Sequence, residues 1–130
     1  MATFPVLDSD VLIDYLRGVG PGSDLVQELS VDLSFRVTAV TAFELALGRG
    51  YARDPTPVDA LLAAPCLGLT REAAVRAGAL LRELRANGVG IDIRDAMQAG
   101  ICLEAGAQLI TRNIRHFARV PGLQAMEPGR

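Results

Sequence analysis

The chain has 130 residues, half of them hydrophobic, which suits one domain with a real core and argues against disorder. Its net charge is -2 and its 13 basic residues are all arginines, so chemistry that requires a lysine is excluded. The sequence shows no signal peptide and no apolar segment long enough to span a bilayer. We therefore expect a soluble, cytoplasmic protein.

The first half of the chain alternates short apolar runs with segments of helical character. In chain order the predicted elements are a strand at residues 3–7, helices at 11–16 and 23–29, a strand at 35–38 and a helix at 41–47. Ser23 or Asp24 is expected to begin the second helix, and Thr41 is expected to open the third.

The second half continues this alternation. Its predicted elements are a helix at residues 57–64, a strand at 66–69, a long helix from 70 to about 87, a helix at 92–106, and strands at 108–110 and 123–126. Thr70 and Asp92 suit the N-caps of their helices, and Pro57 suits a first helical turn. The alternation predicts an α/β fold: a single domain over residues 1–130, with a mostly parallel central sheet of about five short strands and helices on both faces.

Cysteine and histidine are too scarce to form a site by themselves. Cys66 and Cys102 both lie in apolar stretches, and a disulfide framework or a zinc site needs more partners than these two. We therefore expect two reduced core thiols. The only histidine, His116, excludes a metal site built from several histidines.

Acidic and amide residues follow the predicted strands. Asp8 comes directly after the first strand, Glu44 lies about one helical turn beyond the second, and Asn113 follows the strand at residues 108–110. Asp95 lies in the first turn of the helix before that strand. Ligands of open α/β sheets bind at the carboxyl ends of the strands, so we expect these four side chains to converge there. Clustered carboxylates need cations, and Mg²⁺ or Mn²⁺ at such a site suits hydrolysis of a phosphodiester.

Each of these residues also has a purely structural interpretation. Asp8 can begin the helix after the first strand, and Thr41 with Glu44 has the spacing of a capping box. Asp92 is a helix cap, and Asn113 suits an ordinary turn. The two interpretations are compatible, because an acid at a helix N-terminus can cap the helix and still bind a metal ion.

Four segments, taken in order, resemble the motifs of the PIN-domain ribonucleases, and in particular of the VapC toxins of bacterial toxin–antitoxin pairs. These segments are residues 6–13, 41–45, 93–99 and 109–117, the last followed by 120–123. The resemblance implies that Asp8, Glu44 and Asp95 bind Mg²⁺ or Mn²⁺, directly or through water. It also implies that Ser9 orients a water molecule or a phosphate.

The resemblance includes one departure. The fourth motif often has an aspartate where this chain has Asn113. Asn113 is expected to complete the catalytic set with Asp8, Glu44 and Asp95, but its amide adds no charge. This favours one tight ion site over two. Asp92 and Asp10 are expected to be accessory at most, Asp92 by supplying part of the missing charge.

The resemblance also implies partners. Toxins of this type are neutralised by a VapB-type antitoxin, whose tail blocks the acidic site, often with an arginine, and they usually form homodimers. The apolar residues 11–16 are a candidate antitoxin groove or dimer surface. The alternative is that this segment packs into the core of its own domain.

Arginines near the acidic residues offer a way to bind RNA despite the negative net charge. We predict a basic rim formed by Arg94, Arg112, Arg115 and Arg119, with His116 among them. The expected substrate-binding residues are Ser9, Thr111, Arg112 and Arg115. The alternative is a solvated, arginine-rich face. The RNA remains open among transfer, ribosomal and messenger RNA.

Two other functions compete with this one. The pair Asp8 and Asp10 matches the Asp-x-Asp signature of haloacid-dehalogenase phosphatases, but that chemistry requires a lysine that this chain lacks. A catalytically weak or inactive PIN domain that binds RNA or protein is the second alternative, and the neutral Asn113 is the residue that favours it.

Overall fold

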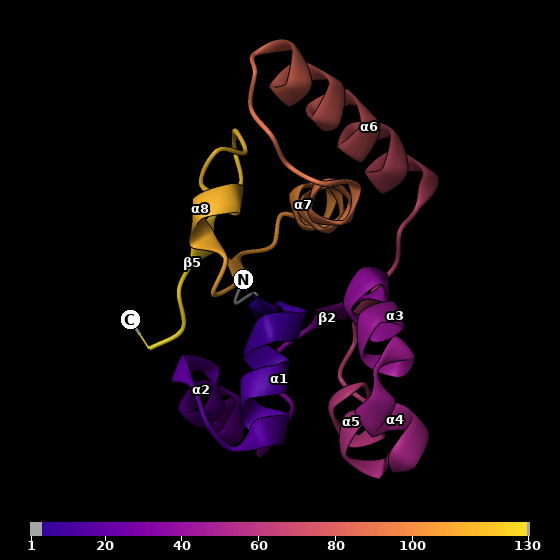
Figure 1. The fold of residues 1–130 in the computed structure, drawn as a ribbon, viewed down its shortest axis with the longest axis vertical. Coiled ribbons are helices and arrows are strands. Elements are labelled where there is room, and N and C mark those ends of the chain that lie inside the picture. Colours follow the sequence, from indigo (N-terminus) through magenta and orange to yellow (C-terminus); the bar gives the residue numbers. More distant parts are fainter. Residues whose placement is uncertain (1–3, 130) are drawn as a thin grey trace.

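The computed structural model describes residues 4–129, in which one to three helices separate each strand from the next (Figure 1). In chain order the elements are β1 (Val6–Leu7), α1 (Ser9–Arg17), α2 (Pro21–Ser30), β2 (Val37–Thr38), α3 (Ala39–Leu47), α4 (Arg49–Arg53), α5 (Thr56–Leu61), β3 (Cys66–Leu67), α6 (Arg71–Ala86), α7 (Ile93–Ala105), β4 (Leu109–Ile110), α8 (Ile114–Phe117) and β5 (Ala125–Met126). The first strand was predicted from Thr3, which lies outside the described residues.

All paired strands are parallel, as predicted. β4 lies between β1 and β5, and β2 pairs with β3. The two groups are connected by an isolated parallel bridge between Val6 and Arg36, where the backbone N–H of Leu7 donates to the carbonyl of Arg36 across 3.0 Å. The strands therefore follow one another in the order β3-β2-β1-β4-β5, and their carboxyl ends lie at one edge.

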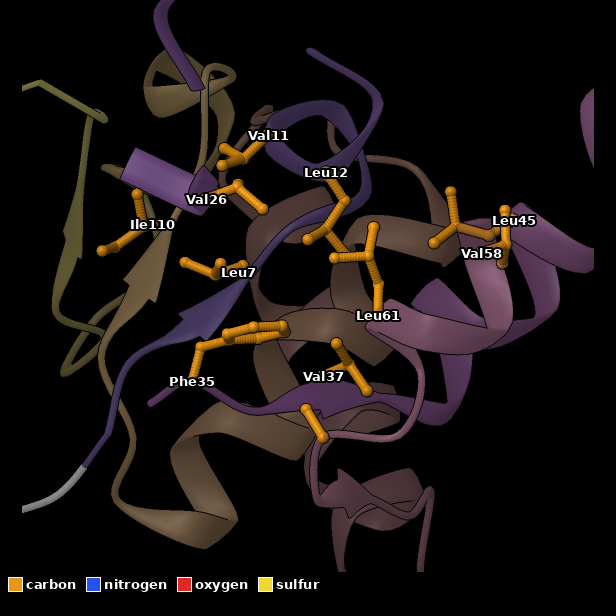
Figure 2. Packing of buried hydrophobic residues seen from close by; sticks show 11 residues of the cluster. Leu7, Val11, Leu12, Val26, Phe35, Val37, Leu45, Val58, Leu61 and Ile110 are labelled. Carbon is orange, nitrogen blue, oxygen red and sulfur yellow. The ribbon is translucent and has the colours of Figure 1, made fainter. Parts of the chain in front are cut away.

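Side chains of the short strands alternate between two hydrophobic clusters. Leu7 and Ile110 belong to the cluster under α1, α2 and α5, whereas Val6 and Leu109 belong to the one under α6, α7 and α8. Figure 2 shows the first cluster, in which Phe35 and the strand residues meet the helices. Both faces of the sheet are thus covered, and each fully buried Leu or Phe contributes about 1.5–3 kcal/mol to folding.

The start of α2 differs from the prediction. The helix begins at Pro21 and not at Ser23 or Asp24, because the ring of Pro21 fixes a helical φ at the first position. The N-terminal turn is capped from another helix: the buried carboxylate of Asp14 accepts a hydrogen bond from the backbone N–H of Gly22 across 2.8 Å.

The start of α3 also corrects the prediction. Thr38 is the N-cap, and its hydroxyl accepts from the backbone N–H of Thr41 across 3.1 Å, so Thr41 lies inside the helix. The capping box proposed for Thr41 and Glu44 is therefore wrong. The shift leaves the side chains of both residues available for the polar cluster described below.

The apolar segment 11–16 mostly packs into the chain's own core. Val11 and Leu12 are fully buried in the first cluster, and Ile13 and Leu16 are partly buried against it. The interpretation of this segment as core is therefore correct for Val11 and Leu12. Only the outer residues of α1 remain for contacts with another chain.

The two cysteines differ in exposure. Cys102 is buried, as predicted, but Cys66 is exposed and is not a core thiol, because β3 lies at the end of the strand order. Among residues 4–129, no helix is both long enough and apolar enough to cross a membrane.

Candidate active site

Asp8 is the first residue after β1 and is almost completely buried. It is the N-cap of α1, and its Oδ1 accepts a hydrogen bond from the backbone N–H of Ser9 across 2.9 Å. Its exposed fraction is 2%. A carboxylate held at such a position must be compensated by hydrogen bonds or by a cation.

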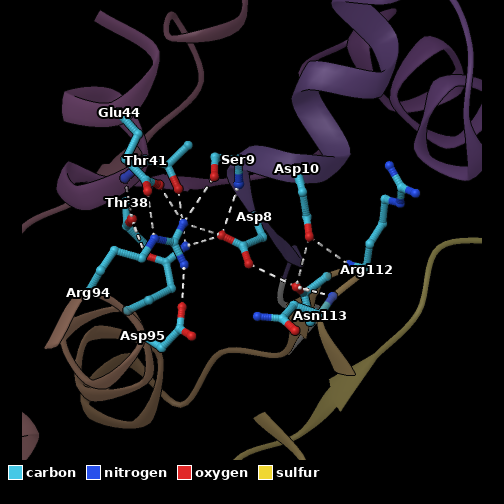
Figure 3. A network of polar contacts seen from close by, with 12 residues as sticks. Asp8, Ser9, Asp10, Thr38, Thr41, Glu44, Arg94, Asp95, Arg112 and Asn113 are labelled. Carbon is cyan, nitrogen blue, oxygen red and sulfur yellow. Dashed lines mark hydrogen bonds and ion pairs between the residues drawn. The ribbon is translucent and has the colours of Figure 1, made fainter. Parts of the chain in front are cut away.

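A buried network supplies part of this compensation (Figure 3). Nε2 of Gln98 donates to Oδ1 of Asp8 and to the hydroxyl of Thr41, each across 3.1 Å. The hydroxyl of Thr111 donates to the other oxygen of Asp8 across 2.8 Å. Thr38 in turn donates to Oε1 of Gln98. Residues of β2, α3, α7 and the loop after β4 therefore fix the orientation of the Asp8 carboxylate.

Arg94 supplies the cation, and it lies at the centre of the cluster rather than on the predicted rim. Its Nη2 lies 2.6 Å from Oδ1 of Asp8 and its Nη1 lies 3.0 Å from Oδ1 of Asp95. Its Nε donates to Oε2 of Glu44 across 2.9 Å, while Nη2 reaches the other oxygen of Glu44 and the hydroxyl of Ser9. The three predicted metal ligands thus converge, and they do so around one guanidinium group (Figure 3).

The electrostatics of the cluster follow from this arrangement. Burial alone lowers the pKa of Arg94, but the hydrogen bond to Glu44 and the charge of Asp8 raise that pKa above its usual range. Burial raises the pKa of Asp95, against the opposing hydrogen bonds from His116 and Arg94. Arg94 is therefore a permanent positive charge within the cluster.

Asp10 joins α1 to the loop after β4. Its Oδ2 accepts from the backbone N–H of Arg112 across 3.2 Å, and its Oδ1 is buried without a hydrogen-bond partner among residues 4–129. Burial, followed by the charge of Asp8, raises the pKa of Asp10 to about 6. Asp10 therefore helps to hold the loop and does not contact the Arg94 guanidinium.

The side chain of Arg112 is partly engaged within the protein. Its Nη1 lies 2.8 Å from the buried Oδ1 of Asp14, although 47% of the side chain remains exposed. Arg115 and Arg119 are exposed on α8 and just after it. Of the four arginines predicted to form a rim, three therefore lie at the surface and Arg94 does not.

Asn113 does not contact the carboxylates directly but is connected to Asp95 by His116. Nδ1 of His116 lies 3.2 Å from Oδ2 of Asp95 and 2.9 Å from Nδ2 of Asn113. The backbone N–H of Asn113 donates to the hydroxyl of Thr111 across 3.0 Å. Asp95 thus presents one oxygen to Arg94 and the other to His116.

Asp92 is a helix cap, as predicted. Its Oδ1 accepts from the backbone N–H of Asp95 across 3.0 Å, and its side chain is exposed. Its carboxylate is committed to the first turn of α7, which places Asp95 without bringing Asp92 into contact with Arg94.

Several residues of the network were not singled out from the sequence. Gln98 had the clearest signal, because it is a polar side chain four residues after Arg94 within the apolar part of α7. Thr38 was predicted only as the end of a strand, and Asp14 only as a polar break in an apolar helix. Their roles depend on contacts between residues far apart in the chain.

An apolar groove of about 470 Å³ opens beside the cluster. Glu44 and Arg94 line it together with hydrophobic side chains of α3, α7 and the segment before α6; these are Ala39, Val40, Phe43, Leu47, Leu69 and Met97. Phe43 and Leu47 are 66% and 74% exposed, and together they give the groove an exposed apolar border.

The donor set fits a hard divalent cation. Three carboxylates surround a position that a positive group already fills, and carboxylate oxygens are the ligands that Mg²⁺ and Mn²⁺ prefer. As the side chains lie, no group of three acidic, cysteine or histidine residues in the described part of the chain is placed to hold a metal ion.

Comparison with known proteins identifies the family of this chain. The family model described as "PIN domain" matches residues 6–123. Ribonuclease VapC19 of Mycobacterium tuberculosis is 30% identical over 121 residues, which cover 92% of this chain and 96% of that protein. The four motifs that suggested the resemblance all lie within the matched residues.

Solved structures share the fold. A VapBC2 complex of Rickettsia felis, bound to a DNA fragment from its promoter, contains a chain with a TM-score of 0.78 and 16% identity, covering 96% of this chain and 98% of that one. VapBC-1 of nontypeable Haemophilus influenzae gives a TM-score of 0.78 and 21% identity over 96% and 98%. The predicted PIN-like α/β fold is therefore confirmed.

Proposed function

This chain belongs to the PIN-domain family and, within it, to the VapC ribonucleases, and we propose that it is a metal-dependent endoribonuclease toxin. It would form a single PIN domain over residues 1–130 and hydrolyse phosphodiester bonds in cellular RNA. The observation that carries this proposal is the convergence of Asp8, Glu44 and Asp95 on one cationic group at the carboxyl edge of the sheet.

We assign the catalytic set to Asp8, Glu44, Asp95 and Asn113. The three carboxylates would hold Mg²⁺ or Mn²⁺, directly or through water, and such an ion supplies an activated water and charge stabilisation at the phosphate. Gln98 and Thr111 keep the Asp8 carboxylate oriented toward the cluster. Asn113 contributes hydrogen bonds without charge.

The RNA would lie against the loop after β4 and the start of α1. Ser9 and Thr111 carry hydroxyls beside the Asp8 carboxylate, and Arg112 and Arg115 are at the surface of the same loop region. Arginine side chains bind phosphates in a bidentate manner, which positions RNA without selecting its sequence. We therefore propose these four residues as the substrate-binding set.

We further propose that a VapB-type antitoxin neutralises this chain and that the chain forms a homodimer in the cytoplasm. The structural neighbours described above are chains of VapBC complexes. The apolar groove bordered by Phe43 and Leu47 lies directly beside Glu44 and Arg94, so an antitoxin segment bound there would also cover the acidic cluster.

A nuclease assay tests the proposed activity. The purified chain is expected to cleave structured RNA in Mg²⁺ or Mn²⁺, to stop in EDTA, and to lose cleavage on Asp8→Asn with its fold intact by circular dichroism. RNA binding without cleavage in any divalent metal would favour the inactive, binding-module alternative. Cleavage that persists in EDTA or in Asp8→Asn would contradict the proposed mechanism.

A further inference from the structure

Arg94 occupies the place where the predicted metal ligands converge. Its guanidinium group contacts Asp8, Glu44 and Asp95 together, along with the hydroxyl of Ser9. We propose that Arg94 is an internal counter-cation: it fills the site in the metal-free protein, moves aside when a divalent ion binds, and so sets the metal affinity of the chain. This inference rests on the proposed function and extends it to regulation of the same site.

The guanidinium group and a divalent ion would compete for the same carboxylate oxygens. Arg94 uses Oδ1 of Asp8 and Oδ1 of Asp95, and it uses both oxygens of Glu44. The remaining oxygens of Asp8 and Asp95 already bond to Thr111 and His116. An ion that binds all three carboxylates therefore competes directly with Arg94 at Glu44, both of whose oxygens already bind the guanidinium group.

Charge explains why such a group is present. Three carboxylates that face one another in a partly buried site repel each other, and removal of the guanidinium group that contacts all three leaves most of that repulsion uncompensated. Arginine remains charged at every pH at which the protein is folded. Arg94 therefore stabilises the metal-free protein. The net binding free energy of a metal ion is reduced by the stabilisation that is lost when Arg94 is displaced.

The structure also gives Arg94 room to move. The residue lies in the first turn of α7, where Asp92 caps the helix and fixes the backbone. Its side chain is 24% exposed and lines the apolar groove beside Phe43 and Met97. The long apolar stem of an arginine can lie along such a groove while its charged end stays near water.

Calorimetric titration of the RNA-free protein with Mn²⁺ tests the proposal. Arg94→Met keeps the length of the side chain and removes its charge, so we expect at least tenfold tighter Mn²⁺ binding and a lower Tm without metal. Arg94→Lys keeps the charge but loses the forked contacts of the guanidinium group, so its Mn²⁺ affinity and its Tm should lie between those of the wild type and of Arg94→Met. Arg76→Met, which removes a surface pair with Glu104, is the matched control and should change neither value.

Unchanged or weaker Mn²⁺ binding in Arg94→Met would overturn the proposal, even if the wild-type chain binds metal and cleaves RNA. If neither protein binds Mn²⁺, the metal site itself fails, and the proposed function fails with it. Should Arg94→Met not fold without metal, the wild-type chain provides the test through the NMR signal of the Arg94 Nε–H. That signal should shift when Mg²⁺ saturates the protein, and a signal that stays fixed at saturation would contradict the inference.

Discussion

Nε2 of Gln98 lies 3.1 Å from Oδ1 of Asp8, and this hydrogen bond connects the middle of α7 to the end of β1. Gln98 is fully buried, and its amide also bonds to the hydroxyls of Thr38 and Thr41. One side chain thus joins the carboxyl ends of two strands. It orients the acidic residue around which the candidate site is built.

Replacement of Gln98 by leucine removes these hydrogen bonds and leaves buried polar groups unpaired. We expect Gln98→Leu to lower the free energy of unfolding by about 2 kcal/mol, and cleavage at saturating metal to fall about tenfold because Asp8 loses its fixed orientation. Urea denaturation and single-turnover cleavage measure the two effects. Gln27→Leu, on the exposed face of α2, is the control. Equal losses of stability and of cleavage rate in both variants would contradict the role of Gln98 in orienting Asp8.

The packing of α6 on α7 gives a prediction about the fold itself. A Cβ at Gly100 would lie 2.7 Å from the carbonyl oxygen of Ala73 and 2.9 Å from Cβ of Ala77. We expect Gly100→Ala to cost about 1–3 kcal/mol because the helices would have to separate. Gly78, on the open face of α6, meets nothing within 4 Å, so Gly78→Ala should stabilise the protein by up to about 1 kcal/mol. The Tm values of the two variants in thermal unfolding measure these effects. A lower Tm for Gly78→Ala with an unchanged Tm for Gly100→Ala would contradict this packing.

The two thiols should differ sharply in reactivity. Burial raises the pKa of Cys102 to about 12, whereas Cys66 is exposed and burial raises its pKa less. At pH 8 a disulfide reagent should therefore modify one thiol per folded chain, and Cys66→Ser should abolish that reaction. Rapid modification of Cys102 in the folded Cys66→Ser protein would be inconsistent with the structure.

The same pKa has a consequence for stability. The thiol of Cys102 stays protonated in the folded chain after the unfolded thiol, with its ordinary pKa of 9.0, has ionised. The unfolded state then binds fewer protons, so the free energy of unfolding should decline as pH rises above about 9. Cys102→Ala should reduce that decline, and an identical pH profile in both proteins would refute this contribution.

Arginines after β4 should govern the affinity for RNA. Arg115→Ala together with Arg119→Ala is expected to weaken RNA binding and to reduce the slope of log affinity against log salt by about 1.5, the value for two lost phosphate contacts. Arg112 is left intact, because its pairing with the buried Asp14 would confuse binding with stability. Arg82→Ala with Arg85→Ala on α6 is the matched control, and an equal effect of both pairs would argue against a binding rim.

The sequence was sufficient to place the strands and the main acidic residues. Apolar runs located the strands, and the rule that parallel strands end at one edge brought Asp8, Glu44 and Asp95 together. The N-caps Thr70 and Asp92 were correct, because side chains that bond to nearby backbone act locally.

What the sequence left undetermined depends on contacts across the fold. Thr38 and Thr41 lie three residues apart and both suit a helix cap, and only the end of β2 decides between them. Arg94 is adjacent to Asp95 in sequence, which suggested a rim, yet its side chain turns inward to three carboxylates, two of them buried. Gln98 reaches Asp8 across ninety positions of the chain, a pairing that no local pattern encodes.

The dependence of single-turnover RNA cleavage on Mn²⁺ concentration tests the central claim most directly. For the wild-type chain, the rate should rise from background in EDTA to a plateau, and Asp8→Asn, Glu44→Gln and Asp95→Asn should each flatten the curve or shift it to higher Mn²⁺. A wild-type rate that is the same in EDTA as in Mn²⁺, or three variants that titrate like the wild type, would contradict a metal-dependent ribonuclease centred on Asp8, Glu44 and Asp95.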